Sequence, residues 1–231
     1  MQPYFFPYIG YFQLMHLSDE FIIFDTVQYR KKGWINRNRV LHPKGGSAYI
    51  NVPIKKFHSN TLIKDILIDN QEDWKTSIIN RLKHYYKEAP YKEEVLSFLK
   101  ECFKEDFESI SELNEHLLRR ICNYLNIQCS ITTLSKSNFT DERATAADEW
   151  GLNICKTVHA DTYLNAPGGI TFFDRNKYKK EDIEIQFINP IFNQYKQSFE
   201  QFEPGLSIID VMMFNSIEKI YEMLGNYEVI H

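Results

Sequence analysis

Four consecutive apolar residues, Phe21-Ile-Ile-Phe24, stand between the carboxylates of Glu20 and Asp25. A short apolar run without polar alternation is typical of a strand that is buried on both faces. We therefore expect an interior strand here, with Asp25 at its carboxyl end. Open α/β sheets place their ligand-binding groups at that end of a strand.

Strands and helices are expected to alternate along the rest of the chain. Helical spacing and capping signals predict helices at residues 8–17, 74–86, 91–104, 109–125, 144–158 and 207–224. Strand patterns occur at residues 40–42, 48–54, 62–68, 129–133, 162–165 and 183–188. This alternation predicts an α/β fold in which a sheet and helices form three layers, and the turn at residues 43–46 adds an antiparallel pair, so the strands are mixed.

We expect one domain over residues 1–231, with a helical insertion at about residues 70–125. The capping box Ser109-Ile-Ser-Glu112 begins one helix of this insertion, and Gly225 is expected just beyond the last helix of the chain. The apolar face after the capping box consists of Leu113, Leu117, Leu118, Ile121 and Leu125.

Composition excludes several classes of protein. The chain has 231 residues and a formal net charge of −4. We expect its Lys and Arg residues to be spread along the chain without a basic stripe, and therefore expect no nucleic-acid partner. No apolar run reaches the roughly 18 residues that span a bilayer, and the start lacks a signal-peptide pattern, so we expect no direct membrane insertion. The four cysteines form no C-x-x-C pair, which predicts reduced thiols in a cytoplasmic protein and no metal site.

The first candidate site is the segment Gln2-Pro-Tyr-Phe-Phe-Pro-Tyr-Ile-Gly-Tyr11. Two prolines stiffen it, and Gly10 allows the backbone to approach a ligand closely. A rigid loop ahead of a helix suits an anion or a nucleotide, which makes Gln2, Tyr4 and Tyr11 candidate binding residues. The alternative is a stiff aromatic turn that seals one end of a sheet.

Asp25 is the second candidate, as a general base or as a group that binds a hydroxyl or an amine. Its alternative roles are a helix cap or a salt bridge to Arg37 or Arg39. The loop that follows mixes amides, a guanidinium group and aromatic rings, which together suit sugars, nucleotides or diphosphates. For Arg37 the alternative is an ordinary charge pair, and for Trp34 it is a core anchor. The candidates in this loop are Gln28, Tyr29, Trp34, Asn36, Arg37 and Asn38.

A third concentration of polar residues runs from Asp161 to Asp174. The consecutive glycines of Ala166-Pro-Gly-Gly169 can present backbone N–H groups to a phosphate or an oxyanion, although Pro-Gly is more often a plain turn. Asp210 stands in an apolar helix and would need a hydrogen-bond partner if buried. The candidates here are Tyr163, Asn165, Gly168 and Gly169.

Common catalytic signatures are absent from the sequence, including the phosphate-binding loop, the dinucleotide fingerprint, the G-x-S-x-G elbow, H-E-x-x-H and HxGH. We therefore expect no cofactor. His42, His58 and His159 are alternative bases, and their spacing selects none of them.

Three motifs in order, M-Q-P-Y-F-F-P-Y-I-G-Y-F-Q-L, E-F-I-I-F-D-T-V-Q-Y and G-W-I-N-R-N-R, resemble the WbqC-like family. Later segments are similar as well, namely A-D-T-Y-L-N-A-P-G-G, the Tyr195–Gln197 stretch and L-S-I-I-D. Members of that family occur with O-antigen and other surface-polysaccharide genes, and a glycine transferase role has been suggested for some. Relatives often carry a few apolar residues ahead of M-Q-P, which would form a first strand. The resemblance points to Gln2, Pro3, Tyr4, Pro7, Gly10, Tyr11, Asp25, Gln28, Tyr29, Trp34, Asn36, Arg37 and Asn38.

The resemblance implies a glycyl or aminoacyl transfer from an activated donor to an amino sugar or sugar nucleotide. Asp25 would serve as the base, and Asn36, Asn38 and the Gly168 and Gly169 amides would hold the oxyanion. Arg37 and Trp34 would hold the diphosphate and a ring of the sugar nucleotide. Two alternatives are an ATP-dependent, acid-activating ligase related to nucleotidyltransferases, and a sugar-nucleotide-binding module without catalysis.

Overall fold

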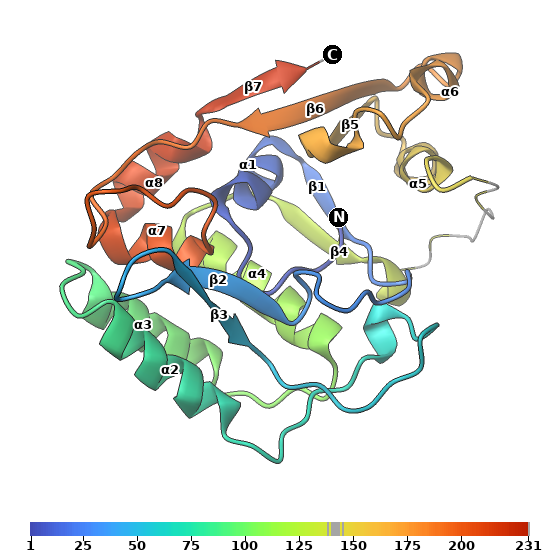
Figure 1. The fold of residues 1–231 in the computed structure, drawn as a ribbon. Coiled ribbons are helices and arrows are strands. Elements are labelled where there is room, and N and C mark those ends of the chain that lie inside the picture. The colour runs from blue at the N-terminus through green and yellow to red at the C-terminus, as the bar shows by residue number, and fades with distance from the viewer. Residues whose placement is uncertain (138, 140–143, 145, 231) are drawn as a thin grey trace.

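The structure is a computed structural model that describes residues 1–137, 139, 144 and 146–230 (Figure 1). The helices are α1 (Ile9–Leu17), α2 (Trp74–Tyr85), α3 (Lys92–Cys102), α4 (Ile110–Tyr124), α5 (Glu149–Val158), α6 (Arg175–Lys180), α7 (Ile208–Phe214) and α8 (Ile217–Leu224). The strands are β1 (Glu20–Ile23), β2 (Arg37–Leu41), β3 (Ser47–Asn51), β4 (Ser130–Thr133), β5 (Thr162–Asn165), β6 (Glu184–Pro190) and β7 (Tyr227–Ile230). Three short 3₁₀ helices are η1 (Ile63–Asp65), η2 (Leu134–Lys136) and η3 (Pro167–Gly169).

The mixed α/β class expected from the sequence is confirmed, and the described strands lie in three small sheets. β1 pairs in parallel with β4, from Glu20 opposite Ser130 to Ile23 opposite Thr133. β2 and β3 form the expected antiparallel hairpin. β6 lies between β5, which is parallel to it, and β7, which is antiparallel. Figure 1 shows the β5–β6–β7 sheet along one side of the molecule and α2 and α3 on the opposite side.

The N-terminal residue extends the β1–β4 pair. The Met1 amine donates to the Ile22 carbonyl at 2.7 Å, and the Phe24 N–H donates to the Met1 carbonyl at 2.8 Å. These two bonds have the pattern of parallel strand pairing, so Met1 pairs with the end of β1. Gln2 therefore leaves the same edge of this sheet as Asp25.

The helical middle of the chain forms one side of the main core. The predicted face of α4 is confirmed, since its apolar side chains are all buried. Ser109 caps α4 by accepting from the Glu112 N–H, and Asp73 caps α2 by accepting from the Thr76 N–H. A second, smaller core lies between α5, α6 and the β5–β6 pair. The assignment of α2 to α4 as an insertion in one domain stays a prediction.

Two element predictions are wrong. Residues 62–68 form η1 and isolated bridges, because Ile63 and Ile66 are buried three residues apart and a strand would turn them to opposite faces. The expected helix at residues 207–224 is broken into α7 and α8. Asn215 adopts extended backbone angles, and the Ser216 side chain accepts from the Lys219 N–H as the cap of α8. A new N-cap inside an apolar run therefore restarts the helix.

Other boundaries differ by less. The expected helix at residues 144–158 begins at Glu149, and position 145 lies outside the described residues. Neither α6 nor β7 was predicted from the sequence. Gly225 is the C-cap residue of α8.

Candidate functional site

Asp25 lies two residues beyond the end of β1, and only 1% of its surface is exposed. Its carboxylate accepts a hydrogen bond from Ser111 Oγ at 3.1 Å, from the Ser135 N–H at 3.1 Å and from Ser135 Oγ at 2.6 Å. Ser111 belongs to α4, and Ser135 belongs to η2, which follows β4. Because β1 and β4 are parallel, their carboxyl ends meet at one edge, and Asp25 ties both ends to α4. We refer to these three residues as the Asp25 cluster.

Ser135 is the exposed member of the cluster, whereas Asp25 and Ser111 are buried. A hydroxyl that donates to a carboxylate at 2.6 Å forms a charge-assisted hydrogen bond. Among the described residues, Ser135 is the exposed hydroxyl that connects the buried Asp25 carboxylate to solvent. Neither serine was predicted from the sequence, although a signal existed. Ser135 stands two residues after a predicted strand, as Asp25 does after β1, and parallel pairing places such positions side by side.

An open hollow with a volume of about 540 Å³ is lined in part by the chain neighbours of two cluster residues. Glu112 follows Ser111 and Lys136 follows Ser135, whereas Asp25, Ser111 and Ser135 themselves do not line the hollow. Its lining residues are Asp106, Phe107, Glu108, Glu112, Glu115, His116, Arg119 and Lys136.

The hollow has an excess of negative charge. Glu115 is paired with Arg119 and Lys136, each at 2.9 Å. Although partial burial opposes it, the hydrogen bonds from Lys136 and Arg119 hold the pKa of Glu115 below its ordinary value. Glu108 and Glu112 are exposed and form no ion pair with any described residue. The hollow therefore suits a ligand that carries an ammonium group.

The aromatic segment at residues 2–8 lies inside the molecule, and its backbone carbonyls are used by the fold. Phe5 and Phe6 are fully buried, and Phe6 adopts a left-handed φ of 42°. Such an angle is costly for a bulky residue and needs support from its surroundings. That support comes from hydrogen bonds that other residues donate to the backbone carbonyls of the segment. Tyr11 Oη donates to the Gln2 carbonyl, the Asn114 amide to Pro3, the Asn38 amide to Phe5 and Phe6, Ser207 Oγ to Phe6, and the Ile208 N–H to Pro7.

This scaffold limits the predicted binding roles of the segment. Tyr11 is fully buried, and burial raises the pKa of its hydroxyl well above the ordinary value. Tyr4 is half-buried, with its ring 5.6 Å from that of Tyr11, and burial also raises its pKa. Binding roles for Gln2, Tyr4 and Tyr11 stay predictions. The geometry favours the alternative of a stiff aromatic turn at the sheet.

The two asparagines proposed for the oxyanion are already hydrogen-bonded. Asn38 is buried and donates to the Phe5 and Phe6 carbonyls at 3.0 and 2.9 Å. Asn36 donates to the Val52 carbonyl at 2.9 Å and accepts from Tyr29 Oη at 2.8 Å. Asn38 thus bonds to backbone groups, and Asn36 bonds to one backbone carbonyl and one side chain. Their catalytic roles stay predictions, and each would require these bonds to break.

A buried acceptor without a partner lies close to this scaffold. Asn114, on α4 one turn after Ser111, donates to the carbonyls of Pro3 and Ile35 at 2.9 and 2.8 Å. Its Oδ1 is buried and receives no hydrogen bond from the described residues. Asn114 therefore connects the N-terminal segment to the loop before β2.

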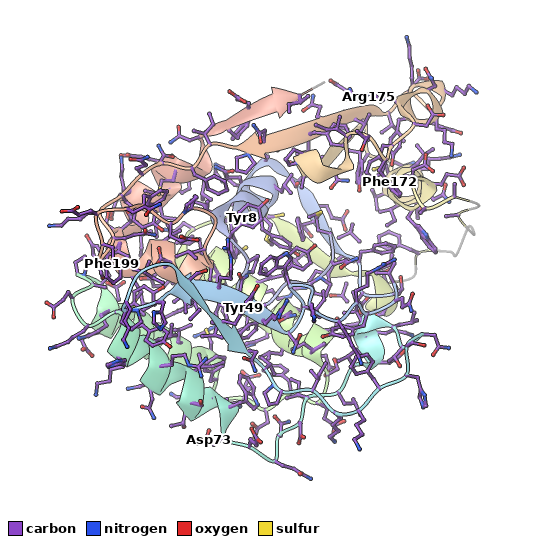
Figure 2. The ribbon with its side chains drawn as sticks, in the orientation of Figure 1. Tyr8, Tyr49, Asp73, Phe172, Arg175 and Phe199 are labelled. Carbon is purple, nitrogen blue, oxygen red and sulfur yellow. The ribbon has the colours of Figure 1, made fainter. Side chains whose placement is uncertain are left out.

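The binding residues predicted in that loop lie partly at the surface and partly in the interior. Gln28 is exposed and donates to the Ser59 carbonyl, while Tyr29 is buried. Trp34 is 37% exposed, and its ring stacks on Tyr49 of β3, with centroids 6.4 Å apart and planes at 29°. The Arg37 guanidinium lies 4.4 Å from the centre of the Tyr49 ring, where cation–π attraction holds it. Figure 2 places Tyr49 at the β2–β3 hairpin.

The third predicted group lies in the smaller core. The Tyr163 ring stacks on Tyr178 at 5.6 Å, and burial raises its pKa. A Cβ at Gly151 would approach the same Tyr163 ring to 2.6 Å, so this glycine allows α5 to pack closely. The Trp150 ring contacts Phe24, 5.5 Å away, and so brings α5 near the Asp25 cluster.

The remaining three candidates show no convergence on that cluster. Asn165 accepts from the Ala166 N–H at 2.8 Å, as in a turn. Gly168 is exposed and Gly169 packs near Phe173, both within η3. Binding roles for Tyr163, Asn165, Gly168 and Gly169 stay predictions.

Asp210 has the partners that its burial requires. It is fully buried and accepts from Tyr86 Oη at 2.8 Å, from Tyr195 Oη at 2.5 Å and from Gln197 Nε2 at 2.8 Å. Burial raises the pKa of this carboxyl above its ordinary value, and these hydrogen bonds oppose that effect. Tyr86 also accepts from the Leu41 N–H at 2.8 Å, so the network ties α7 to β2.

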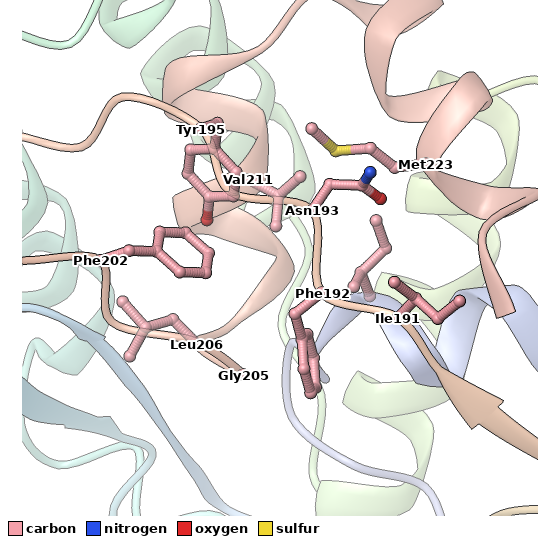
Figure 3. A pocket seen from close by; sticks show the side chains of 10 residues that line it. Ile191, Phe192, Asn193, Tyr195, Phe202, Gly205, Leu206, Val211 and Met223 are labelled. Carbon is pink, nitrogen blue, oxygen red and sulfur yellow. The ribbon is translucent and has the colours of Figure 1, made fainter.

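A cavity of about 20 Å³ adjoins this network (Figure 3). Asn193 and Tyr195 are its polar side chains among residues such as Phe192, Phe202 and Leu206. The volume suits an ordered water molecule and excludes a sugar nucleotide. The Asp210 network is therefore structural, and the candidate functional site is the Asp25 cluster with its hollow.

The four cysteines are free in the structure. Burial raises the pKa of Cys102, Cys129 and Cys155 to about 11 and that of Cys122 to about 12. Such thiols carry little thiolate at neutral pH and make poor nucleophiles. Cys129 is half-buried rather than a full core residue.

The described residues also bear on metal sites and membrane spans. No group of three or more His, Cys, Asp or Glu side chains within that part of the chain is arranged to hold a metal ion. Within the same residues, no helix is long and apolar enough to cross a membrane.

Together, the fold and the cluster define an α/β protein with a polar site at the carboxyl edge of a short parallel strand pair. The model of the WbqC-like protein family matches residues 2–222, and the chain belongs to that family. The chain is also 32% identical over 220 residues to the uncharacterized protein Rv1507c of Mycobacterium tuberculosis, a match that covers 93% of this chain and 91% of that protein. No solved structure matches the chain.

Proposed function

We propose that the protein transfers an activated glycyl or other aminoacyl group to an amine or hydroxyl of an amino sugar or sugar nucleotide, in the synthesis of a bacterial surface polysaccharide such as O-antigen. The observation that carries this proposal is the 2.6 Å hydrogen bond from the exposed Ser135 hydroxyl to the buried Asp25 carboxylate. A buried base that solvent reaches through one hydroxyl can accept a proton while water stays excluded. The glycine transferase role suggested for some family members supports the choice of acyl group.

In the proposed step, the acceptor hydroxyl or amine attacks the carbonyl carbon of the acyl donor. The acceptor gives its proton to Ser135 Oγ, and Ser135 gives its own proton to Asp25. The new acyl bond forms as the bond from the carbonyl carbon to the leaving group breaks. Asp25 then returns the proton through Ser135 to the departing thiolate or alkoxide, so the protein ends unchanged.

The hollow beside the cluster supports an aminoacyl donor over a simple acyl donor. A glycyl group carries an ammonium group next to its reacting carbonyl. Glu108 and Glu112 offer two exposed carboxylates in the hollow that form no ion pair with the described residues. Attraction between these charges would orient the donor carbonyl towards Ser135.

The proposal is tested by product formation. The purified protein is incubated with nucleotide-linked amino sugars and a glycyl thioester, or with glycine and ATP, and the acceptor is examined by mass spectrometry for one added glycyl group. We expect a product from the thioester, and a loss of about 100-fold or more in kcat/KM for Asp25→Asn and Ser135→Ala. Ser130→Ala is the matched control, since Ser130 lies exposed at the opposite end of β4.

Three outcomes separate this proposal from its alternatives. Product formation with glycine and ATP alone, with release of pyrophosphate, would identify an acid-activating ligase. Binding of the sugar nucleotide without any product would identify a binding module. Stable acylation of Ser135 when no acceptor is added would replace direct attack by a covalent intermediate.

A further inference from the structure

The positive charges of the chain are concentrated in one segment. Between Asp25 and Asp65, residues 26–64 contain no Asp or Glu and nine Lys or Arg residues. This acid-free segment therefore carries +9, while the whole chain carries −4 and the remainder −13. The expectation that Lys and Arg are spread along the chain does not hold here. The nine cations are Arg30, Lys31, Lys32, Arg37, Arg39, Lys44, Lys55, Lys56 and Lys64.

Most of this charge has no carboxylate partner. In the part of the chain that the structure describes, Arg39 pairs with Glu203 at 3.5 Å, and the other eight cations form no ion pair. Of these eight, Arg37 is half-buried and the other seven are exposed. An unpaired group of like charges in a protein of net negative charge attracts an anionic ligand.

The acid-free segment folds back on itself. The Tyr29 N–H donates to the Thr61 carbonyl at 2.9 Å, and Lys31 Nζ lies 5.3 Å from the centre of the Phe57 ring. The loop that carries Arg30, Lys31 and Lys32 therefore lies beside the loop that carries Lys55 and Lys56. Their charges add over a single surface.

The hairpin adds a stacking surface. Side chains alternate along β2 and β3, so that Asn38, Val40 and Ile50 are buried, while Arg37 and Tyr49 face outward. Trp34 and Tyr49 are 37% and 41% exposed and stack on each other, with Arg37 against the Tyr49 ring.

Arg37 retains capacity for a ligand. Its Nε and Nη2 donate to the carbonyls of Gly33 and Lys32 at 3.3 and 2.6 Å. These bonds use two of the five N–H donors of a guanidinium group and fix its position. The remaining donors can bind phosphate oxygens, for which the guanidinium fork is well matched.

The two ends of the acid-free segment meet at the candidate reaction site. Thr26 follows Asp25 directly, and the Lys64 N–H donates to the Asp25 carbonyl at 3.0 Å. The Ile63 N–H donates to the Val27 carbonyl at 2.9 Å beside it. The acid-free segment therefore begins and ends beside the Asp25 cluster.

We infer that the acid-free segment binds the nucleoside diphosphate portion of a nucleotide-linked sugar, with a planar ring on Trp34 and Tyr49 and the diphosphate between Arg37 and the neighbouring lysines. This inference rests on the proposed function and deepens it by naming the surface that binds the sugar-nucleotide acceptor. A short diphosphate fits the observations better than a nucleic acid. One aromatic pair offers one stacking position, and a long polyanion would meet the −13 charge of the remainder.

Direct binding to uridine diphosphate tests the inference without any acyl transfer. Trp34 is more exposed than Trp74 and Trp150, so quenching of tryptophan fluorescence reports on it, and the Trp34→Phe protein supplies the background. We expect saturable quenching by uridine diphosphate, with weaker binding at higher salt and weaker binding of uridine. By calorimetry, Trp34→Ala should weaken binding at least about fivefold, as expected for loss of a stacked ring.

The cations are tested with a matched pair of variants. Lys31→Gln/Lys32→Gln removes two charges from the acid-free segment and should weaken binding several-fold. Lys87→Gln/Lys100→Gln removes the same charge from exposed positions after α2 and on α3, and should bind like wild type. Equal weakening in both double variants would overturn the inference, because it would show an effect of net charge alone. Tighter binding of a single-stranded oligonucleotide than of uridine diphosphate would also overturn it and identify a nucleic-acid surface.

Failure of this inference is distinguishable from failure of the proposed function. Asp25→Asn should bind uridine diphosphate like wild type, because Asp25 is buried and carries no part of the stacking surface. Binding without glycyl transfer would refute the transferase and leave the binding surface in place. Transfer to a sugar nucleotide that persists unchanged in Trp34→Ala would refute the binding surface and leave the transferase.

Discussion

Replacement of Asn38 by alanine separates a structural role for this side chain from a catalytic one. The Asn38 amide donates to the Phe5 and Phe6 carbonyls and accepts from the Arg39 N–H at 2.8 Å. In Asn38→Ala, the Phe6 carbonyl keeps its bond from Ser207 Oγ at 2.8 Å. The Phe5 carbonyl loses the hydrogen bond from Asn38, next to a residue with left-handed backbone angles.

The size of the effect follows from these groups. A buried polar group left without a partner costs about 1–3 kcal/mol, so losing the bonds to Phe5 and Arg39 should destabilise the fold by about 2–4 kcal/mol. With a urea m-value near the upper end of the usual range, about 2–3 kcal/mol/M, the unfolding midpoint should fall by roughly 1 M. Asn38→Asp should lose more, because it places a carboxylate against two carbonyl oxygens.

Urea unfolding followed by tryptophan fluorescence measures this change, with Asn51→Ala as a control for an exposed asparagine at the edge of the same hairpin. A loss of less than about 0.5 kcal/mol in Asn38→Ala, well below the cost of an unpaired buried group, would refute the structural account. If such a stable variant also failed to transfer the glycyl group, Asn38 would regain its role at the oxyanion.

Three further predictions concern the buried groups. Asp210→Ala should destabilise the protein by about 2–5 kcal/mol, measured by urea unfolding, because Tyr86, Tyr195 and Gln197 lose a shared acceptor. Burial raises the pKa of Asp210 above its unfolded value of 3.8, so the folded state favours the protonated carboxyl. This preference stabilises the fold fully below pH 3.8, and the stabilisation is lost as the pH rises through the folded pKa. Asp210→Asn should therefore cost less at pH 7 than at pH 4, and a larger cost at pH 7 would contradict this. With thiol pKa values of about 11 to 12, the folded protein should react slowly with a thiol reagent at pH 8, while the urea-unfolded protein should react quickly at all four cysteines. Gly151→Ala should lower the thermal midpoint by several degrees, since the new methyl group would overlap the Tyr163 ring, whereas Gly168→Ala, with open space around it, should not.

Local signals in the sequence predicted much of the fold. The N-cap at Ser109, the apolar face of α4 and the strand at Phe21 each depend on residues close in the chain, and each is confirmed. The strand is not buried on both faces, since Phe21 and Ile23 are buried while Ile22 is half-buried. The break between α7 and α8 was missed because the apolar spacing continues through Asn215 and Ser216. Only the cap bond to Lys219 shows that the helix restarts there.

The candidate site was harder to predict because its partners are distant in sequence. Asp25 was identified from its place after a strand, but Ser111 and Ser135 are 86 and 110 residues away. The asparagines at 36 and 38 suited an oxyanion by residue type, yet their hydrogen bonds depend on Val52 and Phe5. Amide chemistry can be recognised from a sequence, whereas the partner that occupies an amide requires the tertiary structure.

The burial of the aromatic N-terminal segment has a consequence for how the chain folds. The Phe6 and Pro7 carbonyls are bound by Ser207 and Ile208, about 200 residues later, and Gln13 of α1 donates to the carbonyls of Met223 and Asn226. At a synthesis rate of about 5–20 residues per second, these contacts become available roughly 10–40 s after the segment is made. Until then Phe5 and Phe6 lack their final packing partners, so this segment reaches its native environment only after residues about 200 positions later have been made.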